Sequence, residues 1–114
     1  MKKSVAIISL GKFGKQLAIG LSQKGYDVIA VDIKNDPVDD IKELVNYAVA
    51  LDATDEKSMR AVNIDTVDIA VVSMGTNVQA SLLATALLQK LGIVDIYVRS
   101  INHLQENILL SMGI

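Results

Sequence analysis

The sequence predicts an α/β fold, a doubly wound parallel sheet in the strand order 3-2-1-4-5 with helices on both faces. Apolar runs rich in Val and Ile recur five times, as in strands that are buried on both faces of a parallel sheet. Segments with helical spacing lie between these runs, and only a few residues connect one element to the next. Such alternation indicates βαβ units with right-handed crossovers.

Each element can be assigned in order. The strands are expected at residues 5–8, 28–31, 48–51, 69–72 and 96–98, and the helices at residues 14–24, 37–47, 55–62, 77–91 and 103–112. Gly25, Gly92 and Gly113 follow three of these helices, where a left-handed cap is favoured. Pro37 suits a first helical turn with Asp36 as its cap.

Length and composition indicate one domain and argue against nucleic acid as a partner. The 114 residues, of which 51% are hydrophobic, are enough for one core and too few for two, so residues 1–114 are taken as one domain. The chain ends just past a helix, where a sixth strand could begin, which suggests a fragment of a longer chain. A net charge of -2 provides no basic field for nucleic acid.

The absence of cysteine excludes disulfides, thiolate metal sites and thiol nucleophiles, and it fits a reducing compartment. No residue from 69 to 89 is charged, but polar residues interrupt this stretch. No apolar run therefore approaches the roughly 18 residues of a membrane-spanning helix. A buried strand followed by a buried helix is expected there.

The loop after the first strand has the spacing of the dinucleotide-binding motif G-x-G-x-x-G, with Ser9 in place of the first glycine. Gly11 would let the backbone approach a pyrophosphate, and Gly14 would let the helix pack against its strand. A serine can make the turn if its φ is negative, with a hydroxyl that hydrogen-bonds locally. The alternative is a domain that has kept the fold and lost the site.

An acidic residue ends the second predicted strand. Asp32 lies eighteen residues after Gly14, where a carboxylate can accept hydrogen bonds from both ribose hydroxyls and would repel a 2′-phosphate. In a doubly wound sheet the ligand crevice opens at the carboxyl ends of the strands where the chain order reverses. The combination favours NAD or an adenosine nucleotide over NADP.

Other candidates follow the strand ends. Lys12 is either a ligand for a terminal phosphate or a solvated loop lysine, and Phe13 is expected in the core or an interface rather than stacked on a base. Arg99 either binds a ligand phosphate or forms a surface salt bridge. The full set of candidates is Ser9, Gly11, Lys12, Phe13, Gly14, Asp32, Ile33, Lys34, Asp52, Ala53, Thr54, Met74, Gly75, Thr76, Asn77 and Arg99.

Two of these positions carry alternatives of their own. Asp52 either contacts the adenine amino group or belongs to a segment in which Thr54 and Asp55 begin the next helix. Asn77 is expected at the mouth of the crevice, where capping a helix and contacting a ligand are compatible.

No catalytic constellation is recognisable. None of the three tyrosines is followed four residues on by lysine, and the single histidine, His103, has no carboxylate near it in sequence. We therefore expect no enzyme and no metal site. The alternatives are the cofactor half of an NAD-dependent dehydrogenase and an assembly domain with an empty crevice.

Five segments, "SLGKFG", "VDIK", "ALDATD", "SMGTNVQAS" and "VRSIN", together resemble the N-terminal lobe of RCK or KTN domains, also called TrkA-N. These are cytoplasmic regulatory subunits of Trk and Ktr potassium uptake systems. Three positions depart from the family pattern: Ser9 replaces the first glycine, Leu51 stands where glycine is frequent, and Lys12 replaces an arginine. In family members that arginine contacts the terminal phosphate of ATP, which a lysine binds differently.

The resemblance implies a Rossmann-like regulatory domain that binds ATP, ADP or NAD(H). It implies dimers that form an octameric ring beneath a membrane-embedded potassium channel or transporter, at the cytoplasmic face of the membrane. Nucleotide would select the ring conformations that open or close the pore, which requires unequal affinity for those conformations.

Overall fold

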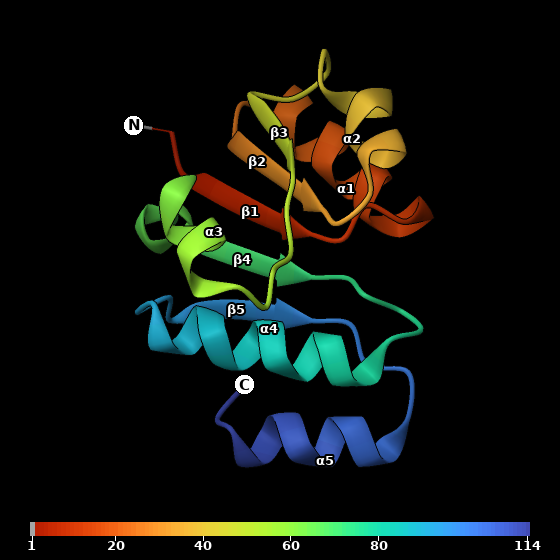
Figure 1. Ribbon diagram of the computed structural model, residues 1–114, viewed down its shortest axis with the longest axis vertical. Coiled ribbons are helices and arrows are strands. Elements are labelled where there is room, and N and C mark those ends of the chain that lie inside the picture. The colour runs from red at the N-terminus through yellow and green to blue at the C-terminus, as the bar shows by residue number, and fades with distance from the viewer. Residues whose placement is uncertain (1) are drawn as a thin grey trace.

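The computed structural model describes residues 2–114, and Figure 1 shows its strands side by side in one sheet. The strands are β1 (Ser4–Ile8), β2 (Asp27–Asp32), β3 (Tyr47–Ala50), β4 (Ile69–Val72) and β5 (Asp95–Val98). The helices are α1 (Lys12–Gln23), α2 (Asn35–Ile41), α3 (Glu56–Ala61), α4 (Val78–Lys90) and α5 (His103–Ser111), with a short 3-10 helix, η1 (Ile64–Thr66).

The sheet is parallel throughout and has the order β3-β2-β1-β4-β5, which confirms the predicted topology. Ile8, the last residue of β1, is in register with Val31 of β2 and Val72 of β4. The carboxyl ends of these three strands are therefore level. The chain order reverses at this edge, because β1 has β2 on one side and β4 on the other.

Alternate residues of β1 enter two separate cores. Ala6 and Ile8 pack on the face covered by α3 and α4, whereas Val5 and Ile7 pack on the face covered by α1 and α2. All four side chains are buried, which explains why the strand reads as a continuous apolar run. Helix α5 lies beside α4 at the end of the molecule (Figure 1).

Helix α2 is shorter than predicted and is shifted toward the N-terminus. It ends at Ile41 rather than continuing to residue 47, and Tyr47 begins β3 instead. Asn46 explains the early ending, because its side-chain oxygen accepts a hydrogen bond from the Val28 amide at 2.9 Å and so brings the chain to β2. Pro37 is in the first turn as predicted, but Lys34 precedes the helix and Asp36 lies inside it.

The other elements deviate less. Helix α1 begins at Lys12, two residues earlier than predicted, with Gly11 as its N-cap. Gly25, Gly92 and Gly113 have φ values of 93°, 93° and 90°, which confirms the left-handed positions predicted for them. The uncharged stretch from 69 to 89 forms β4 and most of α4. Within residues 2–114, no helix has both the length and the apolar character to cross a membrane.

Candidate nucleotide site

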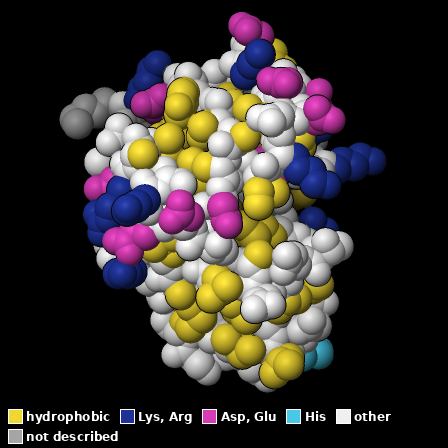
Figure 2. All heavy atoms as spheres, in the orientation of Figure 1, with side chains coloured by type: hydrophobic (Ala, Val, Ile, Leu, Met, Phe, Trp, Pro, Cys, Tyr) yellow, Lys and Arg dark blue, Asp and Glu magenta, His cyan; other side chains and the backbone are white. Residues whose placement is uncertain are grey.

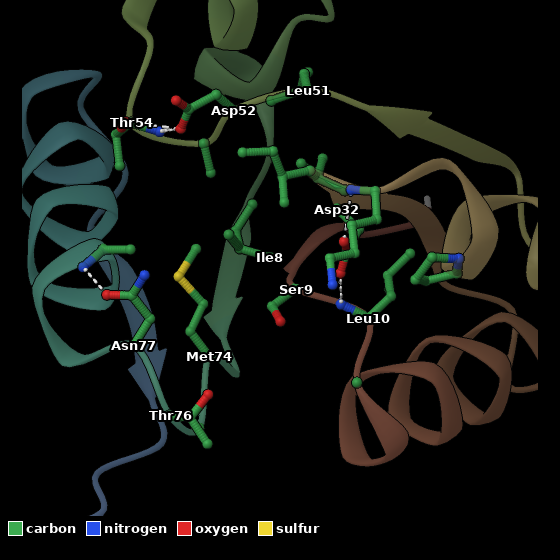
Figure 3. A pocket seen from close by; sticks show the side chains of 18 residues that line it. Ile8, Ser9, Leu10, Asp32, Leu51, Asp52, Thr54, Met74, Thr76 and Asn77 are labelled. Atoms are coloured by element: carbon green, nitrogen blue, oxygen red, sulfur yellow. Dashed lines mark hydrogen bonds between the residues drawn. The ribbon is translucent and has the colours of Figure 1, made fainter.

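A cleft of about 510 Å³ opens at the carboxyl edge of the sheet (Figure 3). The loops after β1, β2, β3 and β4 all contribute to its wall. It brings together most of the residues predicted to form the site: Ser9, Gly11, Asp32, Ile33, Lys34, Asp52, Ala53, Thr54, Met74, Gly75, Thr76 and Asn77. Lys12, Phe13, Gly14 and Arg99 are outside its lining.

The sequence predicted the apolar lining residues Ile33, Ala53 and Met74 but not the rest of the apolar wall. The additional lining residues are Ile8, Leu10, Val31, Pro37, Leu51 and Ala80. Ile8, Val31 and Leu51 lie at or just after the ends of strands, directly beside residues that were predicted. The signal was therefore available, since a residue that ends a strand at the switch point faces the crevice together with the loop that follows.

Ser9 differs from the prediction in two respects. Its φ is 82°, not negative, and within residues 2–114 its hydroxyl forms no hydrogen bond. Two hydrogen bonds donated by backbone amides impose this conformation. The Ser9 amide donates to the Val31 carbonyl at 2.8 Å and so extends the hydrogen bonding between β1 and β2. The next amide, that of Leu10, donates to the Asp32 carboxylate at 2.7 Å. The chain turns within one residue, a geometry that glycine adopts without steric cost.

The two glycines of the loop differ in their surroundings. A β-carbon on Gly14 would lie 2.1 Å from the Ser9 carbonyl oxygen and 2.8 Å from Oγ of Ser73, so close packing of α1 requires glycine here. A β-carbon on Gly11 would meet no atom within 4 Å. The protein's own packing therefore does not require a glycine at position 11.

Asp32 holds the loop as well as lining the cleft. Its Oδ2 accepts from the Leu10 amide at 2.7 Å, and its Oδ1 accepts from the Lys34 amide at 2.9 Å. A carboxylate has about four acceptor sites, so each oxygen keeps capacity for a ligand. Sequence position predicted a ribose contact for Asp32 and did not predict its bonds to the Leu10 and Lys34 amides.

Asp52 and Thr54 form a turn at the opposite wall. Oδ1 of Asp52 accepts from Oγ1 of Thr54 at 2.7 Å and from the Thr54 amide at 2.9 Å. These bonds, the hydroxyl first and the amide second, lower the pKa of Asp52 below its usual value, so the carboxylate is charged at neutral pH. Helix α3 begins at Glu56, with Asp55 preceding it.

Asn77 caps α4, as predicted. Its Oδ1 accepts from the Ala80 amide at 3.0 Å, a bond drawn in Figure 3, and its amide nitrogen is not used in that bond. Met74, Gly75 and Thr76 precede it and form the rim of the cleft opposite the loop after β1. Capping and lining the cleft therefore coexist at Asn77.

Phe13 and Arg99 form a pair beside this rim. Phe13 is 49% exposed, so its predicted core position is wrong, while an interface role stays a prediction. The Arg99 guanidinium carbon lies 5.6 Å from the centre of the Phe13 ring, within the range of a cation–π contact. No carboxylate among residues 2–114 pairs with Arg99, so the predicted alternative of a surface salt bridge is wrong.

His103 has a carboxylate nearby, contrary to the prediction. Its Nδ1 lies 3.8 Å from the carboxylate of Glu106, one turn later in α5. The histidine side chain is fully exposed and lies outside the lining of the cleft. In the described part of the chain, no group of three or more His, Cys, Asp or Glu residues is arranged to hold a metal ion.

These features define the class of the domain. A parallel sheet in this order, with a glycine-containing strand–turn–helix at the switch point and an acid at the end of β2, is a Rossmann-like domain. The chain belongs to the TrkA-N domain family, whose model matches residues 5–114. This confirms the resemblance drawn from the motifs.

A curated relative of this chain is a potassium uptake protein. The chain is 37% identical over 113 residues to Ktr system potassium uptake protein C of Bacillus subtilis, a match that covers 99% of this chain and 51% of that protein. The chain spans about half the length of the curated relatives it matches.

Two solved structures share the fold at lower identity. The NAD(P)-binding domain of an exopolyphosphatase-related protein from Archaeoglobus fulgidus has a TM-score of 0.84 at 21% identity, covering 98% of this chain and 84% of that one. The AMP-bound C-terminal domain of Kef from Shewanella denitrificans has a TM-score of 0.82 at 22% identity, covering 97% and 67%. These likenesses support the fold.

Proposed function

We propose that this domain binds an adenine nucleotide (ATP or ADP) or NAD(H), and that the bound nucleotide regulates a potassium uptake system. The observation that carries the proposal is the cleft at the switch point, which places Gly11, the N-cap of α1, together with Asp32 and Asp52 around one cavity. Family membership and the potassium uptake function named for the Bacillus relative support the biological context.

Each part of the cleft suits one part of the ligand. The first amides of α1 have no partner within the helix, and the N-cap of this helix, Gly11, lines the cleft, so phosphate groups would bind at this end. Asp32 would accept from the ribose hydroxyls while repelling a 2′-phosphate, which disfavours NADP. Asp52, charged at neutral pH, would accept from the adenine amino group.

Lys12 and Arg99 lie outside the lining of the cleft, but each is beside a glycine that lines it, Lys12 beside Gly11 and Arg99 beside Gly75. Lys12 is the first residue of α1, and Arg99 approaches the Gly75 position, where its Nη1 would lie 3.5 Å from an added β-carbon. We propose that they contact a terminal phosphate when the ligand has one. The lysine ammonium is a compact charge, whereas an arginine guanidinium presents several N–H donors in one plane. Lysine therefore discriminates less between phosphate groups of different geometry.

Regulation requires an assembly that changes shape. We propose that the domain forms at least a dimer, that dimers assemble into a ring, and that the ring acts on a membrane-embedded potassium channel or transporter at the cytoplasmic face. The nucleotide shifts this assembly only if it binds one conformation more tightly than the other. No bond needs to be broken, so the domain acts by binding rather than catalysis.

Calorimetric titration of ATP, ADP, NAD, NADH and NADP into one preparation tests the proposal. We expect at least one adenine nucleotide or NAD(H) to bind with one ligand per chain, and NADP to bind more weakly than NAD. Absence of binding by all five ligands would overturn the proposal and favour an assembly domain. Hydride transfer from NADH to a substrate would instead favour the dehydrogenase.

A further inference from the structure

Ser9 combines a left-handed backbone with a side chain that lines the cleft. Its φ of 82° is in the left-handed region, and only one other non-glycine residue among residues 2–114, Asn63 with φ 63°, is found there. Serine pays a steric cost at this position that glycine does not. Strained residues of this kind cluster at functional sites, where the surrounding structure holds them in place.

The surrounding contacts do not let Ser9 relax. Its amide donates to the Val31 carbonyl at 2.8 Å, and its carbonyl oxygen accepts from Oγ of Ser73 at 2.8 Å. The close packing of Gly14 against the same carbonyl blocks movement toward α1. The backbone of Ser9 is therefore held by β2, by Ser73 just after β4, and by α1.

The side chain of Ser9 faces the cleft. Figure 3 shows Ser9 between Leu10 and Met74, with its hydroxyl directed into the cavity. The hydroxyl has no hydrogen-bond partner within residues 2–114, although Ser9 is only partly exposed. Its donor is thus available at the end of the cleft where Gly11 and the first amides of α1 also lie.

We propose that the Ser9 hydroxyl donates a hydrogen bond to a phosphate oxygen of the bound nucleotide. Ser9 then determines specificity for phosphorylated ligands, adding a side-chain donor where the usual motif has only backbone. This inference rests on the proposed nucleotide binding and deepens it. The left-handed backbone, which the bonds to Val31 and Ser73 hold in place, sets the direction in which this side chain leaves the loop.

Three variants of the intact protein separate the hydroxyl from the strain. Ser9→Ala removes the hydroxyl and keeps the β-carbon, Ser9→Gly removes both and releases the strain, and Asn63→Gly releases a left-handed strain outside the cleft. ADP and adenosine are titrated against each variant, and the melting temperature is measured without ligand. Adenosine carries no phosphate, so its affinity reports on the rest of the site.

We expect both Ser9 variants to bind ADP about three- to tenfold more weakly, the usual effect of one lost neutral hydrogen bond, with adenosine affinity unchanged. Ser9→Gly should also melt a few degrees higher, by roughly 2 to 5 °C. Asn63→Gly should keep its ADP affinity, and its melting temperature should rise less, because asparagine tolerates this region better than serine.

Three outcomes would contradict the proposed phosphate contact. If both Ser9 variants bind ADP at least as tightly as the parent, serine is a tolerated substitution and the inference is wrong. A parallel loss of adenosine affinity would assign Ser9 to the shape of the loop, which also overturns the phosphate contact. If the parent itself binds no nucleotide, the proposed function has failed and this inference with it, an outcome visible before any variant is made.

Discussion

At the scale of single residues, Gly11 and Gly14 have opposite constraints within one loop. The β-carbon of alanine would meet nothing of the protein at Gly11, whereas at Gly14 it would overlap the Ser9 carbonyl at 2.1 Å. Under the proposed nucleotide binding, the glycine at position 11 leaves room for the ligand to approach the backbone. The glycine at Gly14 is explained by the fold alone.

Gly11→Ala should abolish nucleotide binding and leave the melting temperature near that of the parent, because the new methyl group would obstruct the approach of the ligand to the backbone without touching the protein itself. Gly14→Ala should lose several kcal/mol of unfolding free energy, since backbone must move to accept the methyl group. Titration with ATP or ADP and thermal unfolding of both variants test this. Tight binding by Gly11→Ala would show that the phosphates do not approach this backbone.

Asp32→Ala should weaken adenosine nucleotide binding by roughly 1.5 to 3 kcal/mol, the scale of a lost charged hydrogen bond. The same change removes the acceptor of the Leu10 amide, so unfolding free energy should fall by roughly 1 to 3 kcal/mol. Asp32→Asn keeps one side-chain acceptor oxygen but removes the charge. Nucleotide titration and unfolding of this variant therefore separate the loss of ligand affinity from the loss of stability. Unchanged nucleotide affinity in both variants would remove Asp32 from the ribose site.

Single residues also mark the limit of sequence reasoning. The position of Asp32 follows from counting along one motif, but its bond to Leu10 depends on the ends of β1 and β2 being level, which only the sheet register provides. The left-handed backbone of Ser9 escaped prediction for the same reason. It results from a ladder bond to Val31 of β2, which is distant in sequence, together with the packing of Gly14 against the Ser9 carbonyl.

At the scale of elements, α4 and α5 begin in the same way. Asn77 accepts from the Ala80 amide at 3.0 Å, and Asn102 accepts from the Gln105 amide at 2.8 Å. Only Asn77 lines the cleft. The two caps therefore form a matched pair in which stability and binding can be separated.

Asn77→Ala and Asn102→Ala should each lower the free energy of unfolding by about 1 kcal/mol, the usual effect of a lost N-cap. Only Asn77→Ala should also weaken nucleotide binding, because its side chain borders the cavity. Chemical unfolding and nucleotide titration of both variants provide the measurement. An equal effect of the two changes on binding would mean that Asn77 acts on the ligand only through helix stability.

The turn that precedes α3 should respond to pH. The bonds from Thr54 lower the pKa of Asp52 in the folded state. They therefore stabilise the folded protein at pH values above the unfolded pKa of about 3.9. This stabilisation is lost as the pH falls through the lower folded pKa. Thr54→Ala should therefore raise the pKa of Asp52 and destabilise the protein at neutral pH more than in acid. Carboxyl NMR titration tests the first effect, and unfolding at two pH values the second. An unchanged Asp52 pKa would contradict it.

At the scale of the whole molecule, the alternation of apolar runs and helical segments was sufficient to predict the sheet order, because right-handed crossovers leave few other arrangements. The length of α2 was not predictable in this way. Its helical pattern continues past Ile41, but the Asn46 side chain bonds to Val28 and the chain joins the sheet. Most residues of the loops that follow the strands were predicted to line the site, but several apolar lining residues, such as Ile8 and Val31, were not.

The surface of α4 and α5 distinguishes the two ends of the molecule. Leu83 of α4 is 51% exposed, and Leu104 and Leu110 of α5 are 71% and 61% exposed. Figure 2 shows hydrophobic side chains gathered over the end of the molecule where these helices lie, while most charged side chains visible on this face lie over the other elements. Exposed apolar side chains of this kind suggest contact with another protein surface.

We therefore expect the chain to sediment with at least twice its mass of 12.3 kDa at micromolar concentration. Leu104→Lys should shift it toward the monomer, because a charge would be buried in the contact. Leu44→Lys is the matched control, since Leu44 is 53% exposed and lies just after α2, away from α5. A parent mass of 12.3 kDa would contradict the prediction, and equal dissociation of both variants would place the contact elsewhere.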